Sequence, residues 1–221
     1  MKELVIKVKV VFAVTLLMLL IVDVLGQELN ATDEKVVRRC GGSVFAVFHS
    51  SNDREFVRLM NLARTNPELL RKYIYTRYDS GYIDRLPWNS MQRSSRFGPR
   101  TLLHHSLGLH MSALYNNIGN GLKGKTGHQY FNDRLILGLN FNTLLTGIAR
   151  GENCEYGSRH AVDIFINLMN SPGHRANILN PDFMRVGVSR KHHRTFGVNT
   201  VSVFSGPKWH DRIFPSVKVE L

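Results

Sequence analysis

Apolar residues recur at helical spacing in the segment that follows residue 50. In "SSNDREFVRLMNLARTNP" the apolar positions on one helical face are Phe56, Leu59, Met60 and Ala63. Asn52 is the candidate N-cap of this helix. Because the residue before a proline avoids the helical conformation, Asn66 ends the helix and caps a second one, which starts at Pro67 and ends before Gly81.

Two more segments show the helical period. One is "PRTLLHHSLGLHMSALYNNIGNG", where Leu103, Leu107, His110 or Met111, and Leu114 recur at helical spacing. The other contains Val162, Phe165 and Met169, with Ser158 as its candidate cap and the turn "NSPG" at its end. The stretch 82–98 has no sustained period and is predicted to be a connecting loop. Glycines at 119, 121, 124 and 127 predict a turn-rich connection that leads to His128.

The period changes to two beyond residue 184. "RVGVSR" and "TFGVNTVSVFS" alternate apolar with small or polar residues, which predicts two antiparallel strands joined around "RKHHR". The alternation shifts its phase between Val198 and Val201, which predicts a bulge. With helices early and strands late, the fold class is α+β, a sheet covered by helices.

The N-terminus, "MKELVIKVKVVFAVTLLMLLIVDVLGQE", combines three lysines with an apolar run from Val10 to Val22. This pattern is typical of a secretory signal peptide, with cleavage near Gly26. The alternative is a membrane anchor, but an anchor needs about 20 apolar residues and Asp23 interrupts the run too early. We therefore expect a secreted, extracellular protein.

Export changes the interpretation of the two cysteines, Cys40 and Cys154. In an oxidising compartment an even pair favours a disulfide. This bridge would close a long loop and stabilise the fold by roughly 4 to 5 kcal/mol on the chain-entropy model. Two free thiols are the alternative, and a nucleophilic Cys154 is the least favoured of the three.

The formal net charge is +12, from 29 lysines and arginines against 17 acidic residues. A basic protein attracts any polyanion, so anionic surfaces are expected partners. The basic residues are scattered and no zinc-finger, RNP or helix-turn-helix pattern accompanies them, which disfavours nucleic-acid binding.

The candidate chemistry is carried by His128, Glu152 and His174. They are too far apart in sequence for a local template such as H-E-x-x-H. Two imidazoles and a carboxylate are nevertheless ligands that Zn²⁺ or another divalent metal accepts. The alternative is that Glu152 is a buried carboxylate satisfied by backbone N–H groups and that His174 only caps a turn. The residues alone leave both open.

Three stretches together resemble a known family: "REFVRLMNLARTNP", "GENCEYG" and "LMNSPGHRANILNPDFMRVGV". They are similar to the secreted CAP superfamily, which includes cysteine-rich secretory proteins, antigen five and pathogenesis-related proteins, and especially to its bacterial-type branch. The resemblance divides the chain into a signal peptide (1–26), an N-terminal arm (27–52), a CAP/SCP-like domain (53–206) and a C-terminal tail (207–221). It implies a three-layer α-β-α sandwich with a central antiparallel sheet.

The resemblance also implies a cleft with two histidines and two acidic residues, where some members bind a divalent ion. By motif, Glu152 is the acid of "GEN", His174 is the histidine of "SPGHR", and His128 in "TGHQYF" matches the other histidine. For the second acid the sequence offers only Asp163. The predicted ligand-binding residues are His128, Glu152, Asp163 and His174, and the predicted metal ligands are His128, Glu152 and His174.

Three functions follow from this comparison. The first is a binding module for an unidentified lipid, sterol or protein. The second is a metal-assisted hydrolase with Glu152 as general base, acting on a water activated between His128 and His174. The single matched carboxylate favours binding over hydrolysis. The third is a cationic protein associated with a surface or cell wall through its positive charge.

Overall fold

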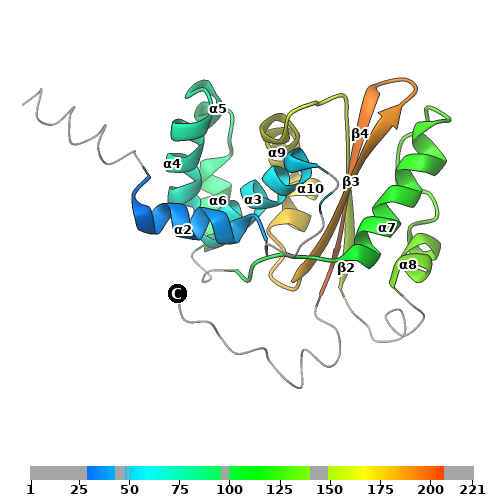
Figure 1. Ribbon diagram of the computed structural model, residues 1–221, viewed down its shortest axis with the longest axis horizontal. Helices are drawn as coiled ribbons and strands as arrows, with labels where there is room; N and C mark the ends of the chain where they lie inside the picture. Colours follow the sequence, from blue (N-terminus) through cyan, green and yellow to red (C-terminus); the bar gives the residue numbers. More distant parts are fainter. Residues whose placement is uncertain (1–28, 43–47, 49, 96–99, 140–148, 207–221) are drawn as a thin grey trace, which may run out of the picture.

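A four-stranded sheet with the strand order β1-β3-β4-β2 forms the centre of the fold. The computed structural model describes residues 29–42, 48, 50–95, 100–139 and 149–206 (Figure 1). The strands are β1 (His104–His105), β2 (Arg150–Tyr156), β3 (Arg185–His193) and β4 (Gly197–Ser205). β2, β4 and β3 are antiparallel, as predicted, whereas β1 adds a short parallel edge to β3. The α+β class is confirmed.

Helices cover both faces of the sheet. They are α2 (Ala31–Cys40), α3 (Ser51–Thr65), α4 (Pro67–Arg77), α5 (Gly81–Asp84), α6 (Trp88–Ser95), α7 (Leu107–Asn116), the π-helix η1 (Asn117–Gly121), α8 (Phe131–Leu139), α9 (Ala161–Asn170) and α10 (Pro172–Ile178). Figure 1 shows α7 and α8 on one side of the sheet and α3, α9 and α10 on the other, with α4 and α5 further out. This is the α-β-α arrangement that the resemblance implies.

β3 and β4 carry apolar side chains on both faces of the sheet, because helices bury both faces. Val186, Val188 and Phe204 belong to a cluster with α3 and α9, whereas Val201 and Val203 pack with α7 and α8 on the opposite face. The β3–β4 register runs without interruption from Arg185↔Ser205 to His193↔Gly197. The predicted bulge is therefore wrong, since the shift in alternation reflects burial on two sides.

Local capping explains where the predicted helices begin. The Asn66 side chain accepts a hydrogen bond from the backbone N–H of Leu69, and Pro67 occupies the first turn of α4, as predicted. The cap of α3 is Ser50, not Asn52. The predicted loop 82–98 contains α6 and all of α5 except its first residue, Gly81.

Asn52 instead caps a helix that is distant in sequence. Its side chain donates to the carbonyl of Arg159 and accepts from the N–H of Ala161, the first residue of α9. Ser158, the predicted cap of α9, hydrogen-bonds Glu155. The start of α9 is therefore fixed by a tertiary contact with α3.

The predicted disulfide is wrong, because both cysteines are free thiols. Cys40 is buried with α2 and α3, and Cys154 points from β2 to the face covered by α7 and α8. The sheet therefore lies between the two. Of the predicted segments, the signal peptide (1–26) and the tail (207–221) lie outside the described residues. None of the helices within the described ranges has both the length and the apolar character needed to span a bilayer.

Candidate functional site

The edge strand β2 presents Glu152 and Cys154 on the same face of the sheet, because successive side chains on a strand alternate. Three other elements bring side chains to this point. Asn116 comes from the end of α7, His128 from the loop before α8, and Arg134 from α8 itself. The site is thus assembled from segments far apart in the chain.

The Glu152 carboxylate is held in a buried, bidentate pair with Arg134. The guanidinium donates to Oε2 at 2.7 Å and to Oε1 at 3.0 Å. Only 2% of the Glu152 side chain and 6% of the Arg134 side chain are exposed. Arg134 also donates to the carbonyls of Ser112 and Gln129, each at 3.0 Å. One guanidinium therefore joins β2, α7 and the loop before α8.

Burial opposes ionisation of Glu152, but its partners outweigh that effect. Removal from water alone would raise the carboxyl pKa, whereas the hydrogen bonds and positive charges of His128 and Arg134 lower it below its usual value. Asn116 donates a further hydrogen bond to Oε1 at 3.1 Å. Glu152 is an ionised carboxylate with both oxygens engaged.

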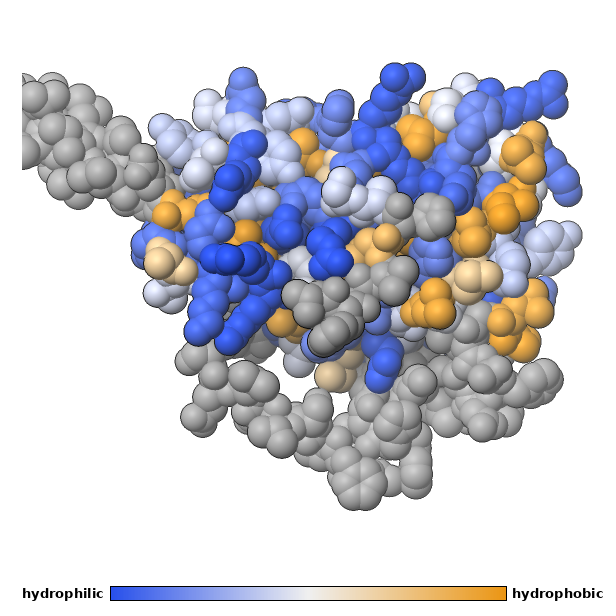
Figure 2. Space-filling view, viewed as in Figure 1, coloured by the Kyte–Doolittle hydropathy of each residue, from blue (hydrophilic) through white to orange (hydrophobic). Residues whose placement is uncertain are grey.

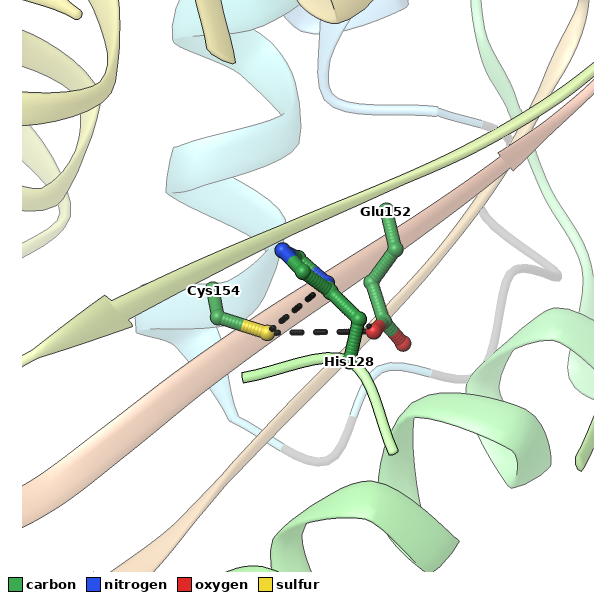
Figure 3. Close-up of side chains that lie close together, drawn as sticks. All are labelled: His128, Glu152 and Cys154. Atoms are coloured by element: carbon green, nitrogen blue, oxygen red, sulfur yellow. Dashed lines mark hydrogen bonds and ion pairs between the residues drawn. The ribbon is translucent and has the colours of Figure 1, made fainter. Parts of the chain in front are cut away.

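His128 lies over this carboxylate with its second ring nitrogen turned outward. Its Nδ1 is 2.9 Å from Glu152 Oε1, and 52% of the side chain is exposed (Figure 3). Because the carboxylate can only accept, Nδ1 carries the proton and the neutral ring keeps its lone pair on Nε2. The hydrogen bond to Glu152 raises the pKa of His128.

The backbone before His128 is fixed by contacts with β2 and α7. Gly127 has φ of 107°, a conformation that glycine adopts without strain. Its N–H donates to the hydroxyl of Tyr156 at 2.8 Å, and its carbonyl accepts from Asn116 at 3.2 Å. The backbone contacts of Gly127 and the hydrogen bond from Nδ1 to Glu152 therefore together fix the position of the His128 imidazole.

Cys154 completes a compact group with His128 and Glu152, whose potential ligand atoms all lie within 4.8 Å of one another. Its Sγ is 3.8 Å from His128 Nδ1 (Figure 3). Burial, and then the charge of Glu152, raises the pKa of this thiol to about 12. A cation bound among these atoms would meet a protonated thiol, an occupied carboxylate and the nearby charge of Arg134. This group is therefore a poor metal site and a good orienting network for His128.

His174 approaches the same edge of the sheet from the opposite helical layer. It lies in α10, which packs against β2, and its backbone carbonyl accepts from the Asn153 side chain at 3.0 Å. Burial lowers the pKa of His174, and the charge that His128 carries when it is protonated lowers it further. Among the described residues, the group whose ligand atoms lie within 4.8 Å of one another contains His128, Glu152 and Cys154, and His174 is not part of it. The neutral imidazole of His174 offers a ring nitrogen lone pair near the same edge of the sheet.

This arrangement lies within a segment that matches a known family. Residues 114–204 match the model of CAP, the cysteine-rich secretory protein family. This part of the chain is a CAP domain. The family indicated by the "GEN" and "SPGHR" motifs is thereby confirmed, and the matched segment contains His128, Glu152 and His174.

Three solved structures of bacterial proteins are similar to parts of the chain. An outer surface protein from Borrelia burgdorferi has a TM-score of 0.42 and 17% identity, over 57% of this chain and 90% of that one. An extracellular protein containing an SCP domain from Bacillus anthracis has a TM-score of 0.42 and 20% identity, over 60% and 42%. A cysteine-rich secretory protein from Staphylococcus aureus has a TM-score of 0.41 and 14% identity, over 72% and 40%.

This chain therefore spans less than half the length of two of these three proteins. The comparison with curated protein sequences found no match.

The CAP domain does not bring Asp163, the predicted second acid, to the His128 network. Asp163 lies on α9, where its carboxylate is 3.6 Å from the guanidinium of Arg85, and both side chains are partly exposed. It connects α9 to the outer helices. Its side chain thus serves a surface ion pair between helices, and sequence position alone could not distinguish that role from a cleft acid.

Sequence reasoning missed Arg134 and Asn116, which determine how Glu152 behaves. Arg134 stands in the segment "FNDRLILGL", next to apolar residues that face the sheet. An arginine at such a position needs a buried acceptor, because an unpaired charge is costly to bury. An arginine among apolar residues of a predicted helix could therefore have been matched with a buried carboxylate such as Glu152 from the sequence alone.

Proposed function

We propose that the CAP domain is a secreted binding module whose binding group is the exposed Nε2 of His128, assisted by His174. The observation that carries this proposal is the bidentate pair between Glu152 and Arg134. It holds the carboxylate in place, and the carboxylate in turn fixes the tautomer and orientation of His128.

The site we propose for a divalent metal, zinc or another, is the Nε2 of His128, with His174 as a further donor. Histidines that bind metals commonly donate their other ring nitrogen to a carboxylate, and the Glu152–His128 pair has this form. We therefore place Glu152 behind His128 as an outer partner, and not among the ligands as the sequence predicts. A bound ion would supply positive charge and an open position for a donor atom of the ligand.

Hydrolysis with Glu152 as general base is less well supported. A general base needs a free oxygen within reach of the proton that it removes. Both oxygens of Glu152 already accept hydrogen bonds, and its lowered pKa makes it a weak base. The contacts of Glu152 thus favour positioning over proton transfer.

The ligand class follows the family expectation of an extracellular lipid, sterol or protein. Secretion is supported by the N-terminal sequence and by the match of residues 114–204 to the cysteine-rich secretory protein family.

The test is zinc binding by the purified mature protein, measured by calorimetry and by metal content. We expect one zinc per chain, lost in both His128→Ala and His174→Ala. His192→Ala is the matched control, because His192 is an exposed histidine on β3 outside this network. Absence of zinc after loading, or an equal loss in the control, contradicts the proposal.

A further inference from the structure

We propose that one end of the molecule docks on a lipid bilayer with anionic headgroups. The surface, here named the cationic tip, consists of Leu122, Lys123 and Lys125 from the loop after η1, and Arg194 and Phe196 from the β3–β4 turn. All five side chains are exposed. This inference goes beyond metal binding and does not depend on it.

The two segments of the cationic tip lie side by side. The N–H of Arg194 donates to the carbonyl of Gly121 at 2.9 Å, and the hydroxyl of Thr195 reaches the carbonyl of Gly124 at 3.4 Å. A side chain on Gly121 would meet the His192 carbonyl at 2.7 Å, so the backbones are in close contact. In Figure 1 the end of η1 and the β3–β4 turn reach the same end of the molecule.

A buried histidine makes this surface rigid. His193 Nδ1 accepts from the N–H groups of Thr195 and Phe196, so its Nε2 carries the proton and donates to the Lys125 carbonyl at 3.0 Å. The Phe196 ring packs on His193 and Tyr156, with centroids 5.1 and 5.5 Å away. The backbone of the cationic tip is therefore preorganised in the unbound protein.

The charge of this surface has one sign. No acidic residue occurs between positions 85 and 132 or between 183 and 210, the two stretches that supply the cationic tip. Within the part of the chain that the structure describes, no carboxylate pairs with Lys123, Lys125 or Arg194. Figure 2 shows hydrophilic and hydrophobic residues intermixed at this end of the visible face.

The apolar side chains favour a bilayer over a soluble polyanion. Leu122 is 64% exposed and Phe196 is 47% exposed, beside three cations. A hydrophilic polymer would leave both apolar side chains in water. At a bilayer surface the apolar side chains can enter the acyl-chain region while the cations stay among the anionic headgroups. Tyr156, which supports Phe196, also accepts the N–H of Gly127, so the cationic tip is continuous with the His128 loop. Docking would bring His128 close to the membrane surface.

The test measures partition of the mature protein onto vesicles of phosphatidylcholine alone and with phosphatidylglycerol, by co-sedimentation. We expect binding only to the anionic vesicles. Lys123→Gln/Lys125→Gln should weaken it roughly 25-fold, about fivefold per charge. Lys35→Gln/Arg39→Gln removes the same charge from the exposed face of α2 and should cause only a small loss.

Leu122→Ser tests the apolar contribution and should weaken binding roughly tenfold. Leu137→Ser, at a leucine of α8 that is 71% exposed, is its control. Circular dichroism and thermal unfolding confirm that each variant remains folded, and zinc titration reports separately on the metal site, so failure of this proposal is separable from failure of the metal site. The proposal is overturned by absence of binding, by equal losses in the controls, or by a charge effect without a leucine effect. In the last case, binding to polyglutamate would identify an acidic polymer as the partner.

Discussion

Replacing Arg134 by methionine tests whether the Glu152 network is as strongly fixed as its geometry indicates. The substitution keeps an unbranched apolar stem of similar reach but removes the guanidinium. Glu152 then remains as a buried charge, 2% exposed, with hydrogen bonds from His128, Asn116 and the weak thiol donor of Cys154, all to Oε1. The carbonyls of Ser112 and Gln129 also lose their donor.

The expected loss of unfolding free energy is about 3 to 5 kcal/mol, because breaking a buried ion pair leaves an uncompensated charge. This is a large share of the total stability of a domain, which is about 5 to 15 kcal/mol. Arg85→Met is the matched control. Arg85 pairs with Asp163 at 3.6 Å with 49% of its side chain exposed, so its loss should cost only about 0.2 to 1 kcal/mol.

The assay is urea unfolding followed by far-UV circular dichroism, with the slope checked so that a midpoint shift reports stability. The double variant Arg134→Met/Glu152→Leu removes both charges and should be more stable than Arg134→Met alone. A loss below about 1 kcal/mol for Arg134→Met, similar to that of an exposed pair, would refute the reasoning. So would a double variant whose loss equals the sum of the two single losses.

Three further predictions concern other parts of the fold. Gly187→Ala would place a methyl group 2.0 Å from the backbone of α7 and should prevent folding to a soluble protein, whereas Gly119→Ala, with open space around it, should express normally. Burial lowers the pKa of His105 to about 4 from 6.5, so the unfolded chain binds this proton more readily. The stability from this group is present above pH 6.5 and lost towards pH 4, and in His105→Gln the stability profile should be flatter in that range. Cys40 and Cys154 should both react with a thiol reagent in urea without prior reduction, and neither should react in the native protein.

Periodicity predicted the elements whose apolar pattern is local. α3, α4 and α9 follow the helical spacing of their apolar residues, and Asn66-Pro67 marks the junction between α3 and α4 as predicted. α7 follows its spacing only from Leu107, because Leu103 precedes β1 and lies outside the helix. β3 and β4 follow their period of two. Each of these signals depends on residues within a few positions of one another, so the sequence contains it in full.

Elements without such a pattern escaped prediction. β2 reads "RGENCEY" and carries polar residues on both faces, because its side chains meet buried partners such as Arg134 on one side and Asn177 on the other. β1 is only a two-residue pairing with β3 and cannot be recognised alone. These assignments depend on the neighbours that a residue acquires in the folded chain.

The sequence by itself determined the fold class and the family, through the apolar periods and the motifs around Glu152 and His174. Only the tertiary structure decided what the site residues do. It separated the two cysteines by the sheet, directed Asp163 to a surface pair with Arg85, and set Arg134 against Glu152. The physical reason is that ionisation, hydrogen bonding and exposure depend on distances across the fold, and residues far apart in the chain set those distances.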